Sequence, residues 1–487
     1  MGLPGGDEIA LEEKEMTGYK AAFHAYAQQH RNEMIDMLRC LVSMRSDRDE
    51  AKLGEPFGKQ CADILRLTER LYAANGFKTK NCIRDGYLLA YCGEGEKSIG
   101  LFAHADTVES QNDWLLTHPY TPLLRDGFLI GRGVKDDKAG IVISLWCARM
   151  FRDLQIPLRS RLILFTGCNE ESGMQDIENF AATEEMPSFN LVCDTAFPIY
   201  VGDKGGLIVE CETETPFETI QAFEGGESAN ISLGEAKACM PFTEELWTEL
   251  SELQDSHLAV TKDDGKLWLN AKGISTHGAL PEGALNAGLL AAKALLRCKS
   301  IQGNDRIVAN SLVLLLEDVY GEMLGIGASD VHFGPVTCTN GKVSLHNGRV
   351  RCTLDIRHGD SVHQSELLAN LENGLKNLGF KITAITRRAL PWRLEESNPF
   401  VQGLDGVYRE MTSDTRPIRY NAGRTYACCL KNAIEVGTST GGHSFPDSIA
   451  GHGNVHQPDE MLSIDGFTEA FELIASMLIE ADRILNL

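Results

Sequence analysis

The stretch that decides the fold is Leu101–Lys138, which reads LFAHADTVESQNDWLLTHPYTPLLRDGFLIGRGVKDDK. Its apolar start ends in His104-Ala105-Asp106, and residues i and i+2 of a strand point to the same face. His104 and Asp106 are therefore presented together at the end of a buried strand, where the aspartate can bind a metal ion or orient the imidazole. The adjacent carboxylates of Asp136 and Asp137 repel unless a cation lies beside them, so the stretch predicts a metal site.

Strands and helices alternate on both sides of this stretch. The pattern predicts helices over residues 17–45, 57–75 and 139–151 and strands over 86–91, 98–103, 161–167 and 190–193. The strands end at His or acidic residues, and ligands of open α/β sheets bind beyond the carboxyl ends of the strands. We therefore predict an α/β domain with a mostly parallel central sheet and a site at its carboxyl edge.

The pattern changes near Gly206, where strand-like stretches over 207–212, 267–271 and 343–356 and helices over 283–298 and 362–378 indicate an inserted α+β domain. We expect a catalytic domain over 1–205, an inserted lid or substrate domain over 206–388, and the rest of the catalytic domain over 389–487. Residues 1–16 are acidic and are expected to form a mobile tail. The final helix is expected over 464–484.

Composition narrows the class of protein. The 487 residues contain 43% apolar and 24% charged residues, an ordinary globular balance, and carry a net charge of −23. That charge argues against nucleic acid or an anionic membrane as a partner. The fourteen cysteines are scattered without a CxxC pair, no apolar run approaches the ~18 residues of a membrane span, and the N-terminus does not resemble a signal peptide. A cytoplasmic protein is expected.

The candidate metal ligands carry nitrogen and oxygen donors and no thiolate. Such donors suit Zn²⁺ in an open catalytic site, with Mn²⁺ or Co²⁺ also possible, and a bridging carboxylate allows two metals about 3.5–4 Å apart. One of the neighbours Glu170 and Glu171 can bind metal while the other takes a proton from water. The candidates are His104, Asp136, Glu171, Asp194 and His456.

Six motifs carry a resemblance to a known family. They are HAD, GRGVKDDKAG, NEESG, CDTAFP, STHG and VHQPDE, in that order. In this order they resemble the co-catalytic zinc peptidase family, which includes aminoacylase, acetylornithine deacetylase and carnosinase. Within it the chain is most similar to bacterial dipeptidases of the Xaa-His type, from about residue 30 to the end.

The resemblance implies roles in the first domain. Asp136 would bridge two metals, and its peptide bond to Asp137 would be cis. One metal would be completed by His104 and Asp194, and the other by Glu171 and His456. Glu170 would be the general base, and Asp106 would hold the His104 ring.

The resemblance also implies substrate contacts outside the ligand set. His277 would polarise the scissile carbonyl, and Arg357 would bind a carboxylate through its planar fork. Asn230 would contact the substrate, and Gly423 and Arg424 would lie in a Gly-rich loop near the substrate carboxylate.

Two features depart from the family pattern. Ala139 precedes Gly140 where the family has Gly directly after DDK, which leaves the ligands unchanged. His443 and His452 compete with His456 for the last ligand position. We prefer His456 because its His-Gln-Pro-Asp-Glu context matches the His-x-x-x-Glu of the family.

The resemblance implies a monomeric metal-dependent dipeptidase that acts on free dipeptides through a metal-activated water. An N-acyl-amino-acid deacylase or carboxypeptidase of the same family is an alternative, because it would use the same ligands and base. A non-catalytic binding protein is a third possibility, but no ligand or base is lost.

Overall fold

The computed structural model describes residues 6–110, 113–226, 228–447, 449 and 451–487, and the chain divides into two compact units. Unit 1 comprises Met1–Gly202, Arg393–Arg419 and Thr425–Leu487, and unit 2 comprises Asp203–Trp392 and Tyr420–Arg424. The expected boundaries put Gly423 and Arg424 in the catalytic domain, whereas contacts group them with unit 2. One reason is that the N–H of Lys204 donates to the carbonyl oxygen of Asn421 at 3.0 Å.

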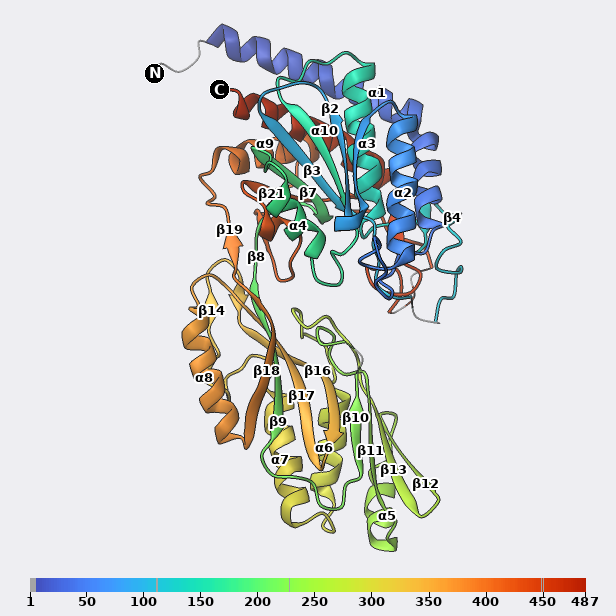
Figure 1. The fold of residues 1–487 in the computed structure, drawn as a ribbon, viewed down its shortest axis with the longest axis vertical. Helices are drawn as coiled ribbons and strands as arrows, with labels where there is room; N and C mark the ends of the chain where they lie inside the picture. The colour runs from blue at the N-terminus through green and yellow to red at the C-terminus, as the bar shows by residue number, and fades with distance from the viewer. Residues whose placement is uncertain (1–5, 111–112, 227, 448, 450) are drawn as a thin grey trace. The chain divides into compact units, whose positions relative to one another are not determined.

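A nine-stranded sheet forms the centre of unit 1 (Figure 1). Its strands lie in the order β1-β2-β6-β3-β7-β21-β8-β19, and β20 pairs with β8. The strands are β1 (Lys78–Cys82), β2 (Tyr87–Cys92), β3 (Ser98–His104), β6 (Arg161–Gly167), β7 (Phe189–Thr195), β8 (Tyr200–Asp203), β19 (Trp392–Arg393), β20 (Arg419–Asn421) and β21 (Ala433–Gly437). A separate three-stranded sheet contains β4 (Leu123–Arg125), β5 (Phe128–Ile130) and β22 (Met461–Ser463).

The middle of the large sheet is parallel, as predicted. Strand β3 pairs in parallel with β6 and β7, and β21 pairs in parallel with β7. The β1–β2, β2–β6 and β21–β8 pairs are antiparallel, so the sheet is mixed rather than mostly parallel throughout. Every residue of β3 is buried, which is the pattern of a strand covered on both faces. The α/β prediction is confirmed.

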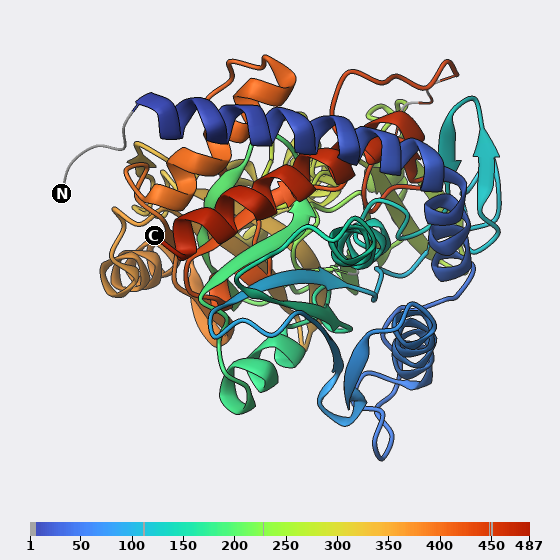
Figure 2. The same ribbon diagram turned by 90° about the horizontal axis from the view of Figure 1, so that it is seen from above.

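Helices α1, α3 and α10 of unit 1 pack against one another, and Figure 2 shows α1 and α10 side by side. Helix α1 begins at Gly6, inside the predicted mobile tail, because Ile-Ala-Leu-Glu-Glu-Lys-Glu-Met continues the helix with strong helix formers. The helices are α1 (Gly6–Val42), α2 (Lys59–Ala74), α3 (Lys138–Asp153), α4 (Gln175–Thr183), α9 (Pro399–Thr412) and α10 (Ile464–Leu485), with 3₁₀ turns η1 (Ile83–Asp85) and η2 (Tyr426–Cys429).

Unit 2 is built on an eight-stranded sheet in the order β12-β13-β11-β10-β16-β17-β9-β18. Adjacent strands pair antiparallel throughout this order. The strands are β9 (Gly205–Thr213), β10 (Ala222–Gly225), β11 (Glu235–Pro241), β12 (Leu258–Asp263), β13 (Lys266–Lys272), β16 (Thr337–His346), β17 (Arg349–His358) and β18 (Phe380–Ala389).

Four helices and a short two-stranded sheet complete unit 2 among the described residues. The apolar face of the large sheet and these helices enclose one buried cluster that includes Phe223, Leu269 and Leu312. The elements are α5 (Glu244–Ser251), α6 (Ala287–Arg297), α7 (Gly303–Glu317), α8 (Gln364–Asn377), β14 (Ser329–Asp330) and β15 (Gly334–Pro335). Across the part of the chain that the structure describes, no helix has the length and apolar character needed to span a membrane.

Candidate metal centre

The predicted ligands of unit 1 gather at the carboxyl edge of its sheet. His104 is the last residue of β3, and Asp194 lies near the end of β7. Both stand two residues beyond the parallel pair Phe102–Val192, so the two side chains start from equivalent depths. Glu171 follows β6, the other parallel neighbour of β3.

Asp136 lies between two imidazoles. Its Oδ1 is 3.0 Å from Nε2 of His104, and its Oδ2 is 3.0 Å from Nε2 of His456. The peptide bond from Asp136 to Asp137 is cis, as the resemblance implies. Each oxygen of one carboxylate therefore faces a different nitrogen ligand.

Two further carboxylates complete the halves of this arrangement. Asp194 Oδ1 lies 3.5 Å from His104 Nε2, on the Oδ1 side of Asp136. Glu171 Oε2 lies 3.1 Å from His456 Nε2, on the Oδ2 side. Each half thus contains one imidazole, one carboxylate of its own and one oxygen of Asp136.

The donor set fits metal ions. One ligand atom from each of His104, Asp136 and Glu171 lies within 4.8 Å of the others, and the same holds for His104, Asp137 and Asp194. Glu170 Oε1 is a buried atom that makes no hydrogen bond with the described chain. Buried polar atoms are normally paired, so this oxygen is available to an ion or a water.

The cluster holds more negative charge than the chain neutralises. Burial raises the pKa of Asp194 to about 7 and that of Glu170 well above its usual value. Burial opposes the charged form of His104, but the negative charge of Asp194 holds its pKa well above the ordinary value. The charge of Glu171 raises the pKa of His456 in the same way. A cation at this edge would relieve the repulsion among the carboxylates.

Asp106 holds the cluster, but chiefly through groups that the resemblance does not imply. His104 Nδ1 lies 3.0 Å from the main-chain oxygen of Asp106 and 3.5 Å from its carboxylate. That carboxylate accepts the main-chain N–H groups of Glu170 (3.2 Å) and Glu171 (3.1 Å). Since a carbonyl oxygen can only accept, Nδ1 of His104 must be the hydrogen-bond donor. The neutral ring then has a lone pair on Nε2 that can bind a metal.

Asp137 is a site residue that the sequence reasoning left without a role. Its Oδ2 accepts the N–H of His104 at 3.3 Å, and the side chain is completely buried. A Cβ at Gly140 would lie 2.5 Å from Asp137 Oδ1, so the absence of a side chain at Gly140 makes room for this carboxylate.

Glu460 was also missed, although the quoted VHQPDE motif contains it. Its buried carboxylate accepts N–H groups of Gly133 (3.0 Å), Lys135 (2.9 Å) and Asp136 (3.2 Å), and it pairs with Arg132 at 2.8 Å. Glu460 therefore fixes the loop that presents Asp136. The available signal in the sequence was an acidic residue, Glu460, four positions after the candidate ligand His456.

The structure brings His456, rather than its two competitors, to Asp136 and Glu171. His452 Nδ1 lies 2.7 Å from Asp459, and His443 Nε2 lies 3.4 Å from Glu469. Both rings are therefore directed at other carboxylates. His456 has a left-handed backbone with φ of 64°, a conformation that the sequence pattern does not reveal.

In unit 2, His277 and Asn230 lie in neighbouring loops. The N–H of Gly278 donates to the carbonyl oxygen of Asn230 at 2.7 Å. The N–H of Ala279 donates to Nδ1 of His277 at 3.3 Å, so the neutral ring carries its proton on Nε2. That tautomer can donate a hydrogen bond to a carbonyl oxygen.

Arg357 belongs to the same part of unit 2. Its Nε and Nη2 donate to the two oxygens of Asp355 at 2.7 and 3.0 Å, and both side chains are buried. A Cβ at Gly278 would lie 2.8 Å from Asp355 Oδ2, which shows that the Arg357–Asp355 pair adjoins the His277 loop. Unit 2 therefore brings Asn230, His277 and Arg357 together.

Gly423 and Arg424 lie in a turn after β20. The N–H of Gly423 donates to Asn421 Oδ1 at 2.9 Å, and both residues are half-buried. The structure places this turn in unit 2.

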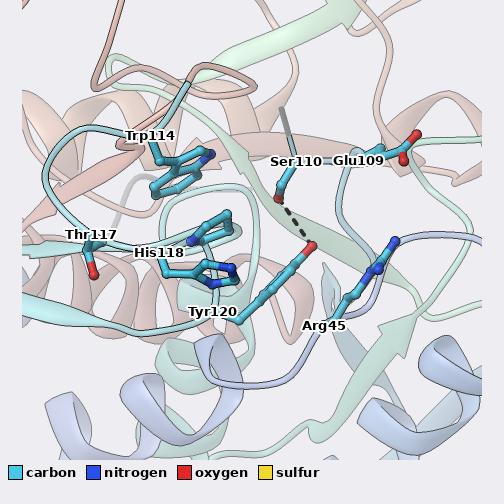
Figure 3. A pocket seen from close by; sticks show the side chains of 8 residues that line it. Arg45, Glu109, Ser110, Trp114, Thr117, His118 and Tyr120 are labelled. Atoms are coloured by element: carbon cyan, nitrogen blue, oxygen red, sulfur yellow. Dashed lines mark hydrogen bonds between the residues drawn. The ribbon is translucent and has the colours of Figure 1, made fainter. Parts of the chain in front are cut away.

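Two cavities of unit 1 adjoin the segments that carry the ligands. One of about 500 Å³ lies after β3, where Figure 3 shows Trp114, His118 and Tyr120 along one side and Arg45 and Glu109 along the other. The other, of about 550 Å³, is lined by residues that include Lys135, Ala196 and Arg419. Lys135, which lines the second cavity, immediately precedes Asp136 in the chain.

Comparison with known proteins identifies the family of this chain. The profile of peptidase family M20/M25/M40 matches residues 100–480, which include the whole ligand set. A candidate dipeptidase of Staphylococcus epidermidis is 26% identical over 452 residues, covering 89% of this chain and 94% of that protein.

Two solved structures share the fold. A di-peptidase of Saccharomyces cerevisiae has a TM-score of 0.60 at 12% identity and covers 95% of this chain and 98% of its own. Human carnosine dipeptidase 1 has a TM-score of 0.59 at 14% identity, with 95% and 99% covered. The family match spans most of the chain, and the chain therefore belongs to peptidase family M20/M25/M40, a family of metal-dependent hydrolases.

Proposed function

We propose that the protein is a dipeptidase that uses two zinc ions and a general base to hydrolyse free dipeptides. The observation that carries this proposal is the carboxylate of Asp136, with Oδ1 3.0 Å from His104 Nε2 and Oδ2 3.0 Å from His456 Nε2. A carboxylate placed in this way can bridge two cations about 3.5–4 Å apart. The dipeptidase name of the staphylococcal relative supports the substrate class.

Each ion has a defined set of ligands in this proposal. His104 and Asp194 hold one ion, Glu171 and His456 hold the other, and Asp136 is shared. The nitrogen and oxygen donors suit Zn²⁺, and Mn²⁺ or Co²⁺ would also fit. Bound zinc supplies Lewis acidity and lowers the pKa of water.

Glu170 moves the proton. Its Oε1 is buried without a hydrogen bond, and burial raises its pKa well above the usual value of a glutamate. It takes a proton from the attacking water and passes it to the departing amine. Asp106 positions it through the N–H at 3.2 Å.

Residues of unit 2 bind the substrate. His277 donates its Nε2–H to the scissile carbonyl oxygen, and Arg357 binds the terminal carboxylate. The pair with Asp355 uses Nε and Nη2 of Arg357, so Nη1 would donate to the substrate carboxylate. Asn230, Gly423 and Arg424 provide further contacts.

The active form is a cytoplasmic monomer in this proposal. All fourteen cysteines are thiols, which suits a reducing compartment. Asp203–Trp392 alone has the size of a full domain, so one chain carries both groups of residues. Mixing inactive His277→Ala chains with inactive Glu170→Gln chains should leave the mixture inactive; recovered activity would show that partner chains complete each other.

A substrate panel tests the activity. The zinc-loaded protein should hydrolyse free dipeptides and leave N-acetylated amino acids and tetrapeptides largely intact. Preferred hydrolysis of N-acetylated amino acids would instead support a deacylase.

A further inference from the structure

Cys428 in unit 1 has two other sulfur atoms near its own, in a turn whose Tyr426 ring lies 6.3 Å from the ring of His104. Cys428 Sγ lies 3.6 Å from Cys429 Sγ and 3.9 Å from the thioether sulfur of Met174. We call these three atoms the sulfur cluster. The two cysteines end η2, and Met174 immediately precedes α4.

The chain fixes the cysteine side of the sulfur cluster. Thr425 caps η2 by accepting the N–H of Ala427 at 3.1 Å, and its hydroxyl donates to Glu435 at 2.6 Å. The buried Tyr426 donates its hydroxyl to Asp176 at 2.5 Å. The turn that carries both thiols is therefore tied to the start of α4.

The methionine side is equally constrained. Met174 is buried and has a left-handed backbone with φ of 63°. Its N–H donates to the carbonyl oxygen of Asn169 at 2.7 Å. Asp176, which receives the Tyr426 hydroxyl, also accepts the N–H groups of Cys168 and Asn169 at 2.7 Å each. The three sulfur atoms are thus held from two sides by one hydrogen-bonded network.

Two thiols and a thioether are soft ligands, which favour monovalent copper over zinc or magnesium. With a metal–sulfur distance of about 2.3 Å, three sulfurs around a trigonal ion stand about 4.0 Å apart (2.3 multiplied by √3). The two distances from Cys428 Sγ, 3.6 and 3.9 Å, are close to this value. We propose that the sulfur cluster is a binding site for a soft monovalent metal ion, of the cuprous class.

Binding is a ligand exchange without electron transfer. The two thiols each release a proton as their sulfur binds the ion, and Met174 contributes a lone pair. Ion and two thiolates together carry one net negative charge, and the thioether stays neutral.

Access distinguishes this pair from the other adjacent cysteines. Cys428 and Cys429 are half-buried, so an ion from solvent can reach them. Cys211 and Cys352 lie opposite each other on β9 and β17, but both are fully buried. The exposed Cys40 provides a thiol control outside the sulfur cluster.

The test is a titration of the zinc-loaded protein with Cu(I) under anaerobic conditions, against a chromophoric Cu(I) chelator. The protein should bind one Cu(I) that Cys428→Ser and Cys429→Ser each lose, and Met174→Leu should bind it more weakly. Cys40→Ser should match the parent, and zinc content should not change. X-ray absorption should show a shell of three sulfurs.

The proposal fails if Cys428→Ser binds Cu(I) as tightly as the parent, or if absorption shows nitrogen ligands. A second measurement requires no variant. Ag(I), a redox-inert probe of the same class, should protect Cys428 and Cys429 from alkylation, as read by peptide mass spectrometry. Equal alkylation of both cysteines with and without Ag(I) would overturn the assignment.

Discussion

Two groups of candidate site residues differ in how their charges are balanced. One lies at the carboxyl edge of the unit 1 sheet, and the other is the Asn230–His277–Arg357 group of unit 2. At the edge, Asp136, Glu171 and Asp194 crowd two imidazoles, and Glu170 Oε1 has no hydrogen bond. In unit 2, Arg357 is already paired with Asp355 through two hydrogen bonds. The first group has the donors to bind cations, whereas the charge of Arg357 in the second group is already balanced by Asp355.

The largest expected effect follows from replacing the shared carboxylate. Asp136→Asn should lose both ions and essentially all activity, because one side chain serves both halves of the centre. Elemental analysis and dipeptide turnover measure this. Asp36→Asn, on the exposed side of α1, is the matched control. If Asp136→Asn retained one ion and full activity, Asp136 would not be a bridging ligand.

The second effect distinguishes loss of the catalytic base from loss of metal binding at the carboxyl edge. Glu170→Gln should keep both ions while kcat falls by about 10²–10⁴-fold, the usual contribution of a general base. Glu178→Gln, exposed on α4, should leave kcat unchanged. Unaltered turnover in Glu170→Gln would exclude Glu170 as the base.

The third effect should be confined to substrate binding. Arg357→Lys should raise KM about 10- to 100-fold, the range expected for a lost hydrogen bond to a charged group, with metal content unchanged. The control is Arg351→Lys, which is exposed on the same strand. Loss of metal from Arg357→Lys would mean that the two groups are not independent.

The smallest effect concerns pH and a carboxylate beside the edge. Burial raises the pKa of Asp176 to about 7 from about 3.9 in an unfolded chain. The folded protein is favoured by protonated Asp176. This contribution to the free energy of unfolding is complete below pH ~4 and is lost as the pH rises to ~7. The parent should therefore lose up to ~1.4 kcal/mol of unfolding free energy per pH unit relative to Asp176→Asn.

Urea unfolding of both proteins at pH 5, 6, 7 and 8 measures this difference. A difference that stays constant from pH 5 to 7 would show that Asp176 does not titrate in that range.

The edge was predictable because short-range patterns place its residues. His104 follows a continuous apolar run, and such runs are buried parallel strands whose carboxyl ends meet. Glu460 and Asp137 were harder to predict, because their partners are main-chain N–H groups that only the folded loop presents. The preference for His456 over His443 and His452, in contrast, came from its sequence context, and His456 does lie beside Asp136 and Glu171.

Unit 2 was less predictable. The stretch 343–356 reads as one strand, but Asn347-Gly348 turns it into the β16–β17 hairpin. Asn-Gly is a known hairpin signal, so this turn was a missed pattern. Helices α5 and α7 were also missed.

The position of β21 has a consequence for the order of synthesis. Ala433–Gly437 enters the sheet between β7 and β8, which leave the ribosome long before it. Until then, β7 has one edge without its final neighbour, and unpaired strand edges invite association with other chains. A nascent or truncated chain that ends before β21 should therefore depend on chaperones, because the sheet of unit 1 can be completed only after residue 437 has been synthesised.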